Sequence, residues 1–141
     1  MKNRHTLKIL LADDDAIDRE LFADAMKSTE VSFVIDEVKN GQEVLDYLKA
    51  CKQFPDFIFL DLNMPIVDGR EALTKIKSSE KFRVIPVFVL STSSSQHDIF
   101  ESYYAGANLF LVKPPSYDAL VSTLKCLLEL YEGSLATAEV V

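Results

Sequence analysis

The sequence predicts an α/β domain in which helices cover both faces of a parallel β-sheet. Short apolar runs alternate with segments that carry apolar residues at helical spacing, five of each along 141 residues. Uninterrupted apolar runs are typical of strands that are covered on both faces. The alternation of strands and helices implies right-handed crossovers and hence a parallel sheet. The length suits one domain, and the 48% share of hydrophobic residues is enough for a packed core.

The strands are expected where the chain is most apolar. Four runs are nearly continuous, at Leu7–Ala12, Phe57–Leu60, 87–90 and Leu109–Val112. The segment 31–38 differs from them, because Phe33 and Ile35 alternate with polar or smaller neighbours. This alternation predicts a strand at an edge of the sheet.

The helices are expected between these strands, where apolar residues recur every three or four positions. The apolar positions are Ile17, Leu21, Phe22 and Ala25 in the first helix, Val44, Leu45 and Leu48 in the second, Ala72, Leu73 and Ile76 in the third, and Leu120, Leu124, Leu127, Leu128 and Tyr131 in the fifth. The fourth segment, Gln96–Tyr104, has a weaker pattern. Turn residues mark the helix boundaries at Asn40-Gly41, Asp68-Gly69 and Ala105-Gly106. Asp15 and Asp68 are expected to start the first and third helices rather than to bind a ligand.

Charge and composition exclude several classes of protein. The 15 basic and 22 acidic residues give a net charge of −7, which disfavours unaided binding to nucleic acid or to an anionic membrane. No apolar stretch approaches the ~20 residues of a membrane helix, and the amino terminus leads into a strand rather than a signal peptide. Cys51 and Cys126 stand alone without metal-ligand spacing, so we interpret them as packing residues. We expect a cytoplasmic protein.

Polar residues gather where the predicted strands end. Asp13 and Asp14 follow the first strand, Asp61 follows the third, Ser91 the fourth and Lys113 the fifth. Ligands of parallel α/β sheets bind at the carboxyl ends of the strands, so these side chains are expected to converge on one rim. Like charges raise one another's pKa and oppose folding, so such an acidic cluster needs a cation.

Magnesium suits the predicted cluster because it prefers carboxylate and carbonyl oxygens in octahedral geometry. Asp14, Asp61 and the backbone carbonyl of Asn63 can supply such oxygens, and Asp13 can act through a coordinated water. A carboxylate attacks a phosphoryl group only when the charge of the donor is neutralised and the groups are held in line. The metal and the ammonium of Lys113 would neutralise that charge. The site therefore predicts magnesium-dependent phosphorylation of Asp61, with Ser91 as a hydroxyl donor to the phosphoryl oxygens.

Four motifs carry a resemblance to a known family. They are Leu10-Leu11-Ala12-Asp13-Asp14, Phe59-Leu60-Asp61-Leu62-Asn63-Met64-Pro65 with Asp68-Gly69, Val89-Leu90-Ser91-Thr92, and Phe110-Leu111-Val112-Lys113-Pro114. Over residues 7–131 the chain resembles the receiver domain of two-component response regulators, the family of the bacterial chemotaxis regulator. The resemblance implies a flavodoxin-like (βα)5 three-layer sandwich with strand order 2-1-3-4-5. The receiver domain is expected over residues 1–132, and the last residues, 133–141, are expected to form a flexible tail.

The resemblance assigns a role to each motif. Asp61 would accept the phosphoryl group of a phosphohistidine on a sensor histidine kinase, while Asp13, Asp14 and the carbonyl of Asn63 would hold Mg²⁺. Ser91 would be the switch hydroxyl, and Lys113 would contact the phosphoryl group. The family also implies that Phe110 is the switch aromatic and that the peptide bond between Lys113 and Pro114 is cis.

The sequence departs from the family pattern at three places. Thr92 replaces a smaller residue after the switch hydroxyl, and Pro115 stands where an aromatic residue is common. Phe110 lacks the hydroxyl of the tyrosine often found there. None of these changes removes a catalytic group.

Three classes of function compete. The first is a stand-alone receiver, which is no enzyme beyond its own phosphorylation and dephosphorylation. The second is an aspartyl-phosphate phosphohydrolase, which would want an acid at position 63, where the chain has Asn. The third is an adaptor with a vestigial site, which the complete set of site residues disfavours.

For a stand-alone receiver the signal is expected to leave through a surface. We expect a histidine kinase, of the phytochrome type by a narrower resemblance, to dock at the first helix and the loops at the strand ends. A downstream target or a second copy is expected at the fourth helix, fifth strand and fifth helix, where at least one aromatic ring of the fourth helix is exposed.

Overall fold

The structure, a computed structural model, describes the backbone of residues 6–140 and the side chains of residues 6–130. Its centre is a parallel sheet of five strands in the order β2-β1-β3-β4-β5, which confirms the predicted flavodoxin-like α/β fold. The strands are β1 (Leu7–Ala12), β2 (Phe33–Val38), β3 (Phe57–Leu60), β4 (Val87–Ser91) and β5 (Leu109–Val112). The alternating segment 31–38 forms the edge strand β2, as predicted.

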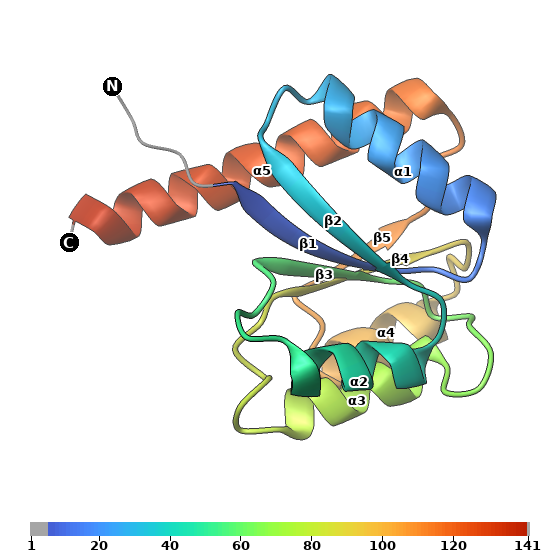
Figure 1. Cartoon of the computed structure of the whole chain (residues 1–141). Coiled ribbons are helices and arrows are strands. Elements are labelled where there is room, and N and C mark those ends of the chain that lie inside the picture. The colour runs from blue at the N-terminus through green and yellow to red at the C-terminus, as the bar shows by residue number, and fades with distance from the viewer. Residues whose placement is uncertain (1–5, 141) are drawn as a thin grey trace.

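The helices lie in two layers, with α1 and α5 on one face of the sheet and α2, α3 and α4 on the other (Figure 1). Their bounds are α1 (Ala16–Ser28), α2 (Gly41–Ala50), α3 (Gly69–Ser78), α4 (Gln96–Tyr104) and α5 (Tyr117–Val140). Helix α5 continues through 133–140, where the sequence predicted a flexible tail. Residue 141 and the side chain of Tyr131 lie outside the described residues, and a domain boundary at residue 132 stays a prediction.

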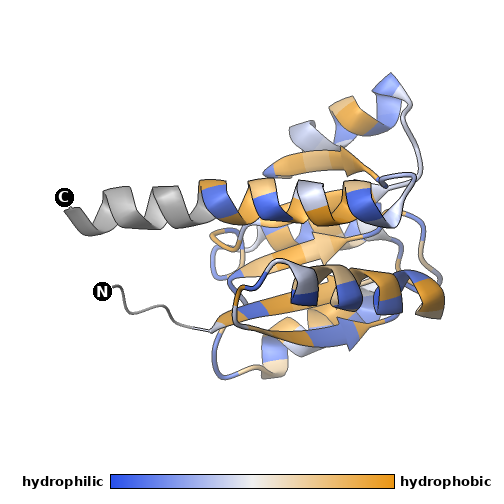
Figure 2. Ribbon diagram, turned by 90° about the horizontal axis from the view of Figure 1, so that it is seen from above, coloured by the Kyte–Doolittle hydropathy of each residue, from blue (hydrophilic) through white to orange (hydrophobic). Residues whose placement is uncertain are grey.

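Two apolar cores fill the space between the sheet and the helix layers. One packs α2 and α3 on the sheet, and the other packs α1 and α5 on its opposite face. Aromatic rings stack edge to face in the second core, where the centroids of Phe22 and Phe59 lie 4.8 Å apart. Figure 2 shows the largely hydrophobic strands between the helices and the alternation of hydrophobic and hydrophilic residues along α5.

Two parts of the chain are less buried than the sequence predicted, namely strand β5 and Cys126. Strand β5 lies at an edge of the sheet, as the strand order 2-1-3-4-5 implied, but only Phe110 in it is buried although its apolar run is typical of a strand covered on both faces. Cys126 was expected to pack inside the protein, but its side chain is exposed on the outer face of α5. Within the described residues, no helix is long and apolar enough to cross a membrane.

Side chains at the helix starts form the predicted caps. The Asp15 carboxylate accepts hydrogen bonds from the N–H groups of Ile17 and Asp18, and Asp68 caps α3 in the same way through Glu71. These caps satisfy amide groups that have no partner inside the helix. They fix where α1 and α3 begin, directly after the strand ends that carry the predicted site.

A close approach at Gly69 presses the start of α3 against the end of β3. A Cβ atom built on Gly69 would overlap the carbonyl oxygen of Asp61, and the Gly69 N–H donates to the Leu62 carbonyl at 2.9 Å. Glycine is therefore required here for space, because any side chain would displace the Asp61 backbone.

We predict that Gly69→Ala lowers the free energy of unfolding by about 2 kcal/mol, the usual effect of an added methyl group in a space that is already filled. Urea denaturation measures it. The matched control is Thr74→Ala on the exposed face of the same helix, which should change stability by less than about 0.5 kcal/mol. Equal stabilities of the two variants would contradict the close approach.

Candidate functional site

The predicted site residues meet at the carboxyl ends of the strands. Asp13 follows β1, Asp61 follows β3, and Lys113 follows β5. The ammonium nitrogen of Lys113 lies 3.0 Å from Asp13 Oδ2 and 3.4 Å from Asp61 Oδ2, although 100 and 52 residues separate these pairs in sequence. Asp13 and Asp61 are buried, so this is a desolvated cluster of charges rather than a surface ion pair.

Three carboxylates lie close enough to share a cation. Asp13, Asp14 and Asp61 each offer one oxygen, and these oxygens all lie within 4.8 Å of one another. Hard oxygen donors of this kind fit a divalent metal such as Mg²⁺, with Asp14 exposed at the open side. The Asn63 N–H donates to Asp61 Oδ1 at 3.2 Å, which orients the carboxylate of Asp61.

Burial dominates the electrostatics of Asp61. Desolvation raises the pKa of its carboxyl group, while the Lys113 ammonium and the Asn63 N–H favour the charged form and the charge of Asp13 opposes it. The net effect is a pKa above the ordinary value, so the ionised carboxylate of Asp61 is held at a cost in stability. Such a carboxylate gains from any further cation that reaches the cluster.

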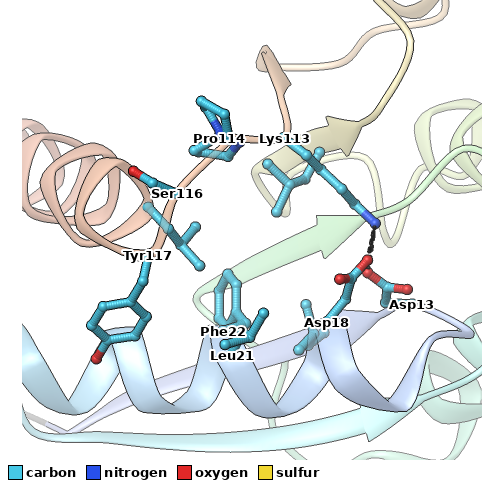
Figure 3. A pocket seen from close by; sticks show the side chains of 12 residues that line it. Asp13, Asp18, Leu21, Phe22, Lys113, Pro114, Ser116 and Tyr117 are labelled. Carbon is cyan, nitrogen blue, oxygen red and sulfur yellow. Dashed lines mark hydrogen bonds and ion pairs between the residues drawn. The ribbon is translucent and has the colours of Figure 1, made fainter.

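Lys113 has a third partner that the sequence analysis missed. Its ammonium nitrogen lies 2.8 Å from Asp18 Oδ2, in the first turn of α1 (Figure 3). Burial by itself lowers the pKa of Lys113, but hydrogen bonds to Asp18 and Asp13 outweigh it and raise the pKa above its ordinary value. In the sequence, Asp18 is simply a further acid five residues after Asp13. Helical periodicity alone does not show that its side chain points toward Lys113.

The fourth strand end carries the predicted switch hydroxyl. Ser91 is fully buried, and its Oγ accepts a hydrogen bond from the Ser93 N–H at 3.1 Å. The Lys113 N–H donates to the Ser91 carbonyl at 2.7 Å, which joins the ends of β4 and β5. Thr92, the residue that departs from the family pattern, is exposed.

Phe110, the predicted switch aromatic, points into the core between the sheet and α4. Its ring is buried in the cluster that contains Val87 and Val89, and its N–H donates to the hydroxyl of Tyr103 at 2.9 Å. Tyr103 thus joins the end of α4 to β5.

One expectation about the backbone was wrong. The described residues contain no cis peptide bond, so the bond between Lys113 and Pro114 is trans. The trans form is intrinsically preferred before proline by about 0.5–1 kcal/mol. With this isomer Lys113 still reaches Asp13, Asp18 and Asp61, so its ion pairs do not require the cis form.

Comparison with protein families identifies the family of the chain. The model of the response regulator receiver domain matches residues 9–125 of the chain. The chain belongs to this family. Receiver domains are signalling modules that take a phosphoryl group from a histidine kinase onto an aspartate in two-component signalling.

Individual relatives agree with this assignment. The receiver is 36% identical to the probable methanogenesis regulatory protein FilR2 of Methanothrix harundinacea over 129 residues, covering 89% of this chain and 83% of the relative. It is 33% identical to the response regulator Rcp1 of Synechocystis over 110 residues, covering 74% and 75% of the two chains.

The fold also superposes on solved structures of response regulators. The crystal structure of the phosphorylated cyanobacterial phytochrome response regulator RcpA matches with a TM-score of 0.85 and 36% identity, over 92% of this chain and 96% of that one. The Mn²⁺-bound form of Rcp1 matches with a TM-score of 0.80 and 28% identity, over 89% and 94%.

The raised pKa of Asp61 leads to a stability prediction. A carboxyl group whose pKa is higher in the folded than in the unfolded state stabilises the fold at low pH, and this contribution is lost as the pH rises through the folded-state pKa. We therefore expect Asp61→Asn to be more stable than the natural protein at neutral pH in a metal-free buffer. The difference should shrink as the pH falls toward the ordinary value of 3.8.

Urea unfolding at several pH values measures this effect. Glu129→Gln, which removes an exposed acid of α5, is the control and should show no such difference. Destabilisation of Asp61→Asn at neutral pH would mean that the attraction of Lys113 outweighs the desolvation of Asp61.

Proposed function

We propose that Asp61 is the phosphoacceptor of this receiver and that Mg²⁺ assists the transfer. The observation that carries the proposal is the meeting of Asp13, Asp14 and Asp61 within 4.8 Å, with the Lys113 ammonium in contact with two of them. Asp61 is buried, and its carboxylate contacts the Lys113 ammonium and accepts a hydrogen bond from the Asn63 N–H. Asp13 and Asp14 lie at the end of β1, where they can bind a cation shared with Asp61.

The proposed reaction transfers a phosphoryl group from the phosphohistidine of a kinase. An oxygen of the Asp61 carboxylate attacks phosphorus, the P–N bond to the imidazole breaks, and the leaving imidazole takes up a proton. The product is an acyl phosphate on Asp61. Lys113 neutralises charge on the phosphoryl oxygens, because its ammonium already lies 3.4 Å from the carboxylate that becomes modified.

Asp13, Asp14, Asp61 and the backbone carbonyl of Asn63 would hold the magnesium ion. When bound, Mg²⁺ supplies the charge neutralisation that three carboxylates and an incoming phosphoryl group require. The Mn²⁺-bound form of Rcp1, a structural relative, supports the binding of a divalent cation by this receiver.

We propose that the signal is read at the surface of α4, β5 and α5. The Ser91 hydroxyl would move to the phosphoryl group, and Phe110 would adjust with it because β4 and β5 are paired through residues 88–91. The exposed rings of Phe100 and Tyr104 on α4 fit a surface that binds a downstream protein or a second copy.

The cognate kinase is proposed to be a phytochrome-type sensor that acts in the cytoplasm. The names of RcpA and of the bacteriophytochrome response regulator RtBRR, both similar structures, support this input. The net charge of −7 makes a protein rather than a nucleic acid the expected output partner.

Phosphorylation by a small phosphodonor tests the assignment of Asp61. Acetyl phosphate with Mg²⁺ should add one labile phosphoryl group, as expected of an acyl phosphate, and Asp61→Asn should abolish it, because the attacking oxygen is removed. Intact mass spectrometry measures the label. Asp15→Asn, whose side chain can still cap α1, is the matched control and should be labelled like the natural protein. Label retained in Asp61→Asn would refute the assignment.

Metal binding has its own test. A ligand that binds only the folded state adds about 1.4 kcal/mol to the free energy of unfolding at ten times its dissociation constant. We expect this gain for Mg²⁺ at that ratio, measured from thermal or urea unfolding. Asp14→Asn, which removes an exposed carboxylate of the cluster, should lose most of it at the same Mg²⁺ concentration. A melting curve that Mg²⁺ leaves unchanged would contradict the metal site.

A further inference from the structure

A second polar network lies beside the phosphorylation loop and is centred on Arg70. Arg70 stands in the first turn of α3, and its Nη1 donates to Asn63 Oδ1 at 3.4 Å. Its Nη2 donates to Asp98 Oδ1 at 3.1 Å, in the first turn of α4. One guanidinium therefore joins the loop that follows Asp61 to the helix that follows Ser91.

Asp98 is the point where this network meets the β4–α4 loop. The hydroxyls of Ser93 and Ser95 and the guanidinium of Arg70 hydrogen-bond to its carboxylate and hold the pKa of Asp98 below its ordinary value. Its side chain is only 17% exposed, whereas that of Arg70 is 43% exposed. The carboxylate of Asp98 is thus stabilised in its charged form from three different positions.

The same loop leads back to the proposed switch residue. The Ser93 N–H donates to Ser91 Oγ, the Ser95 N–H donates to Ser93 Oγ, and the Asp98 N–H donates to Ser95 Oγ, at 3.1, 3.2 and 3.0 Å. Each serine hydroxyl fixes the backbone two or three residues ahead. These hydrogen bonds link the position of Ser91 to that of Asp98. A displacement of Ser91 would therefore also shift Asp98, which the ion pair with Arg70 holds in place.

Besides the partly buried Ile99 and the hydrogen bond from Phe110 to Tyr103, helix α4 has few contacts with the core. Ser102 is its only fully buried residue among the described ones, while Phe100 and Tyr104 are 66% and 83% exposed. A groove of about 440 Å³ separates α4 from α3, with Arg70 and Asp98 among its lining residues. An element with few buried apolar contacts moves at low cost, so specific polar contacts decide its position.

We propose that Arg70 is a positioning residue that restrains α4 in the unphosphorylated protein through its ion pair with Asp98. The inference rests on the proposed phosphorylation of Asp61, since it assigns Arg70 a role in the response to that reaction. When the Ser91 hydroxyl moves to the phosphoryl group, the loop shifts and the pair with Asp98 is weakened. Loss of the pair then favours the phosphorylated conformation, because only the unphosphorylated one is stabilised by it.

Linkage sets the size of the effect. A contact that exists only in the unphosphorylated conformation opposes phosphorylation by its own free energy. Partly exposed ion pairs are weak, so breaking this one should tighten the binding of a phosphoryl analogue by about two- to five-fold. The sign is informative, because a merely structural role of Arg70 would weaken binding or leave it unchanged.

The experiment uses beryllofluoride with Mg²⁺ as an unreactive phosphoryl analogue on the full chain. Arg70→Gln and Asp98→Asn should each tighten its binding about two- to five-fold, measured by titration of backbone amide resonances. In both variants without the analogue, the resonances of residues 96–104 should lie nearer to their positions in the beryllofluoride-bound natural protein. The double variant should show no larger effect than either single variant, because both changes break the same pair.

The matched control is Lys75→Gln, which breaks an ion pair of 3.2 Å between Lys75 and Glu71 within α3. This pair does not reach α4, so binding and resonances should equal those of the natural protein. Unchanged affinity in Arg70→Gln and Asp98→Asn, or additive effects in the double variant, would overturn the role of Arg70 while leaving the proposed function intact. A natural protein that does not respond to beryllofluoride would instead contradict the proposed function.

Discussion

The contact between the Lys113 ammonium and the carboxylates of Asp13, Asp18 and Asp61 is the interaction on which the rest of the site depends. Two of these acids are buried, and isolated buried carboxylates would be strongly destabilising. Lys113 directly follows β5, whereas its partners follow β1 and β3 or lie on α1. The cluster therefore forms only when β5 is at its place in the sheet, and the chemistry of the site is tied to completion of the fold.

The sheet also fixes the backbone of the site residues. The ladder of hydrogen bonds continues one residue past each strand end, so that Asp13, Asp61 and Lys113 each donate an N–H to the neighbouring strand. Their acceptors are the carbonyls of Val38, Ala12 and Ser91. Side chains held in this way keep their geometry without a ligand, which is the preorganisation that charge stabilisation during transfer requires. Helix α4, by contrast, has few buried residues, which suits an element that responds.

The sequence predicted the strand ends and the meeting of Asp13, Asp61 and Lys113 because strand periodicity and the carboxyl-end rule depend on local pattern and topology. It did not predict Asp18 as a partner of Lys113, because the direction of a side chain on the first turn of α1 depends on how that helix packs. The exposure of Cys126 was not predicted for a related reason, since the sequence around an isolated cysteine does not show which face of its helix packs on the core.

Exposure decides which partner Lys113 releases in the proposed reaction. The side chain of Asp18 is 40% exposed, whereas those of Asp13 and Asp61 are 6% and 9% exposed. Water can take over the solvation of Asp18 at little cost, whereas the buried Asp13 would then depend on the proposed Mg²⁺ alone for its charge compensation. In the proposed reaction, an incoming phosphoryl group would therefore displace Asp18 rather than Asp13 from Lys113. The first turn of α1 would then lose its ion pair with Lys113 on phosphorylation. This change would be independent of the one proposed for Ser91, Asp98 and α4.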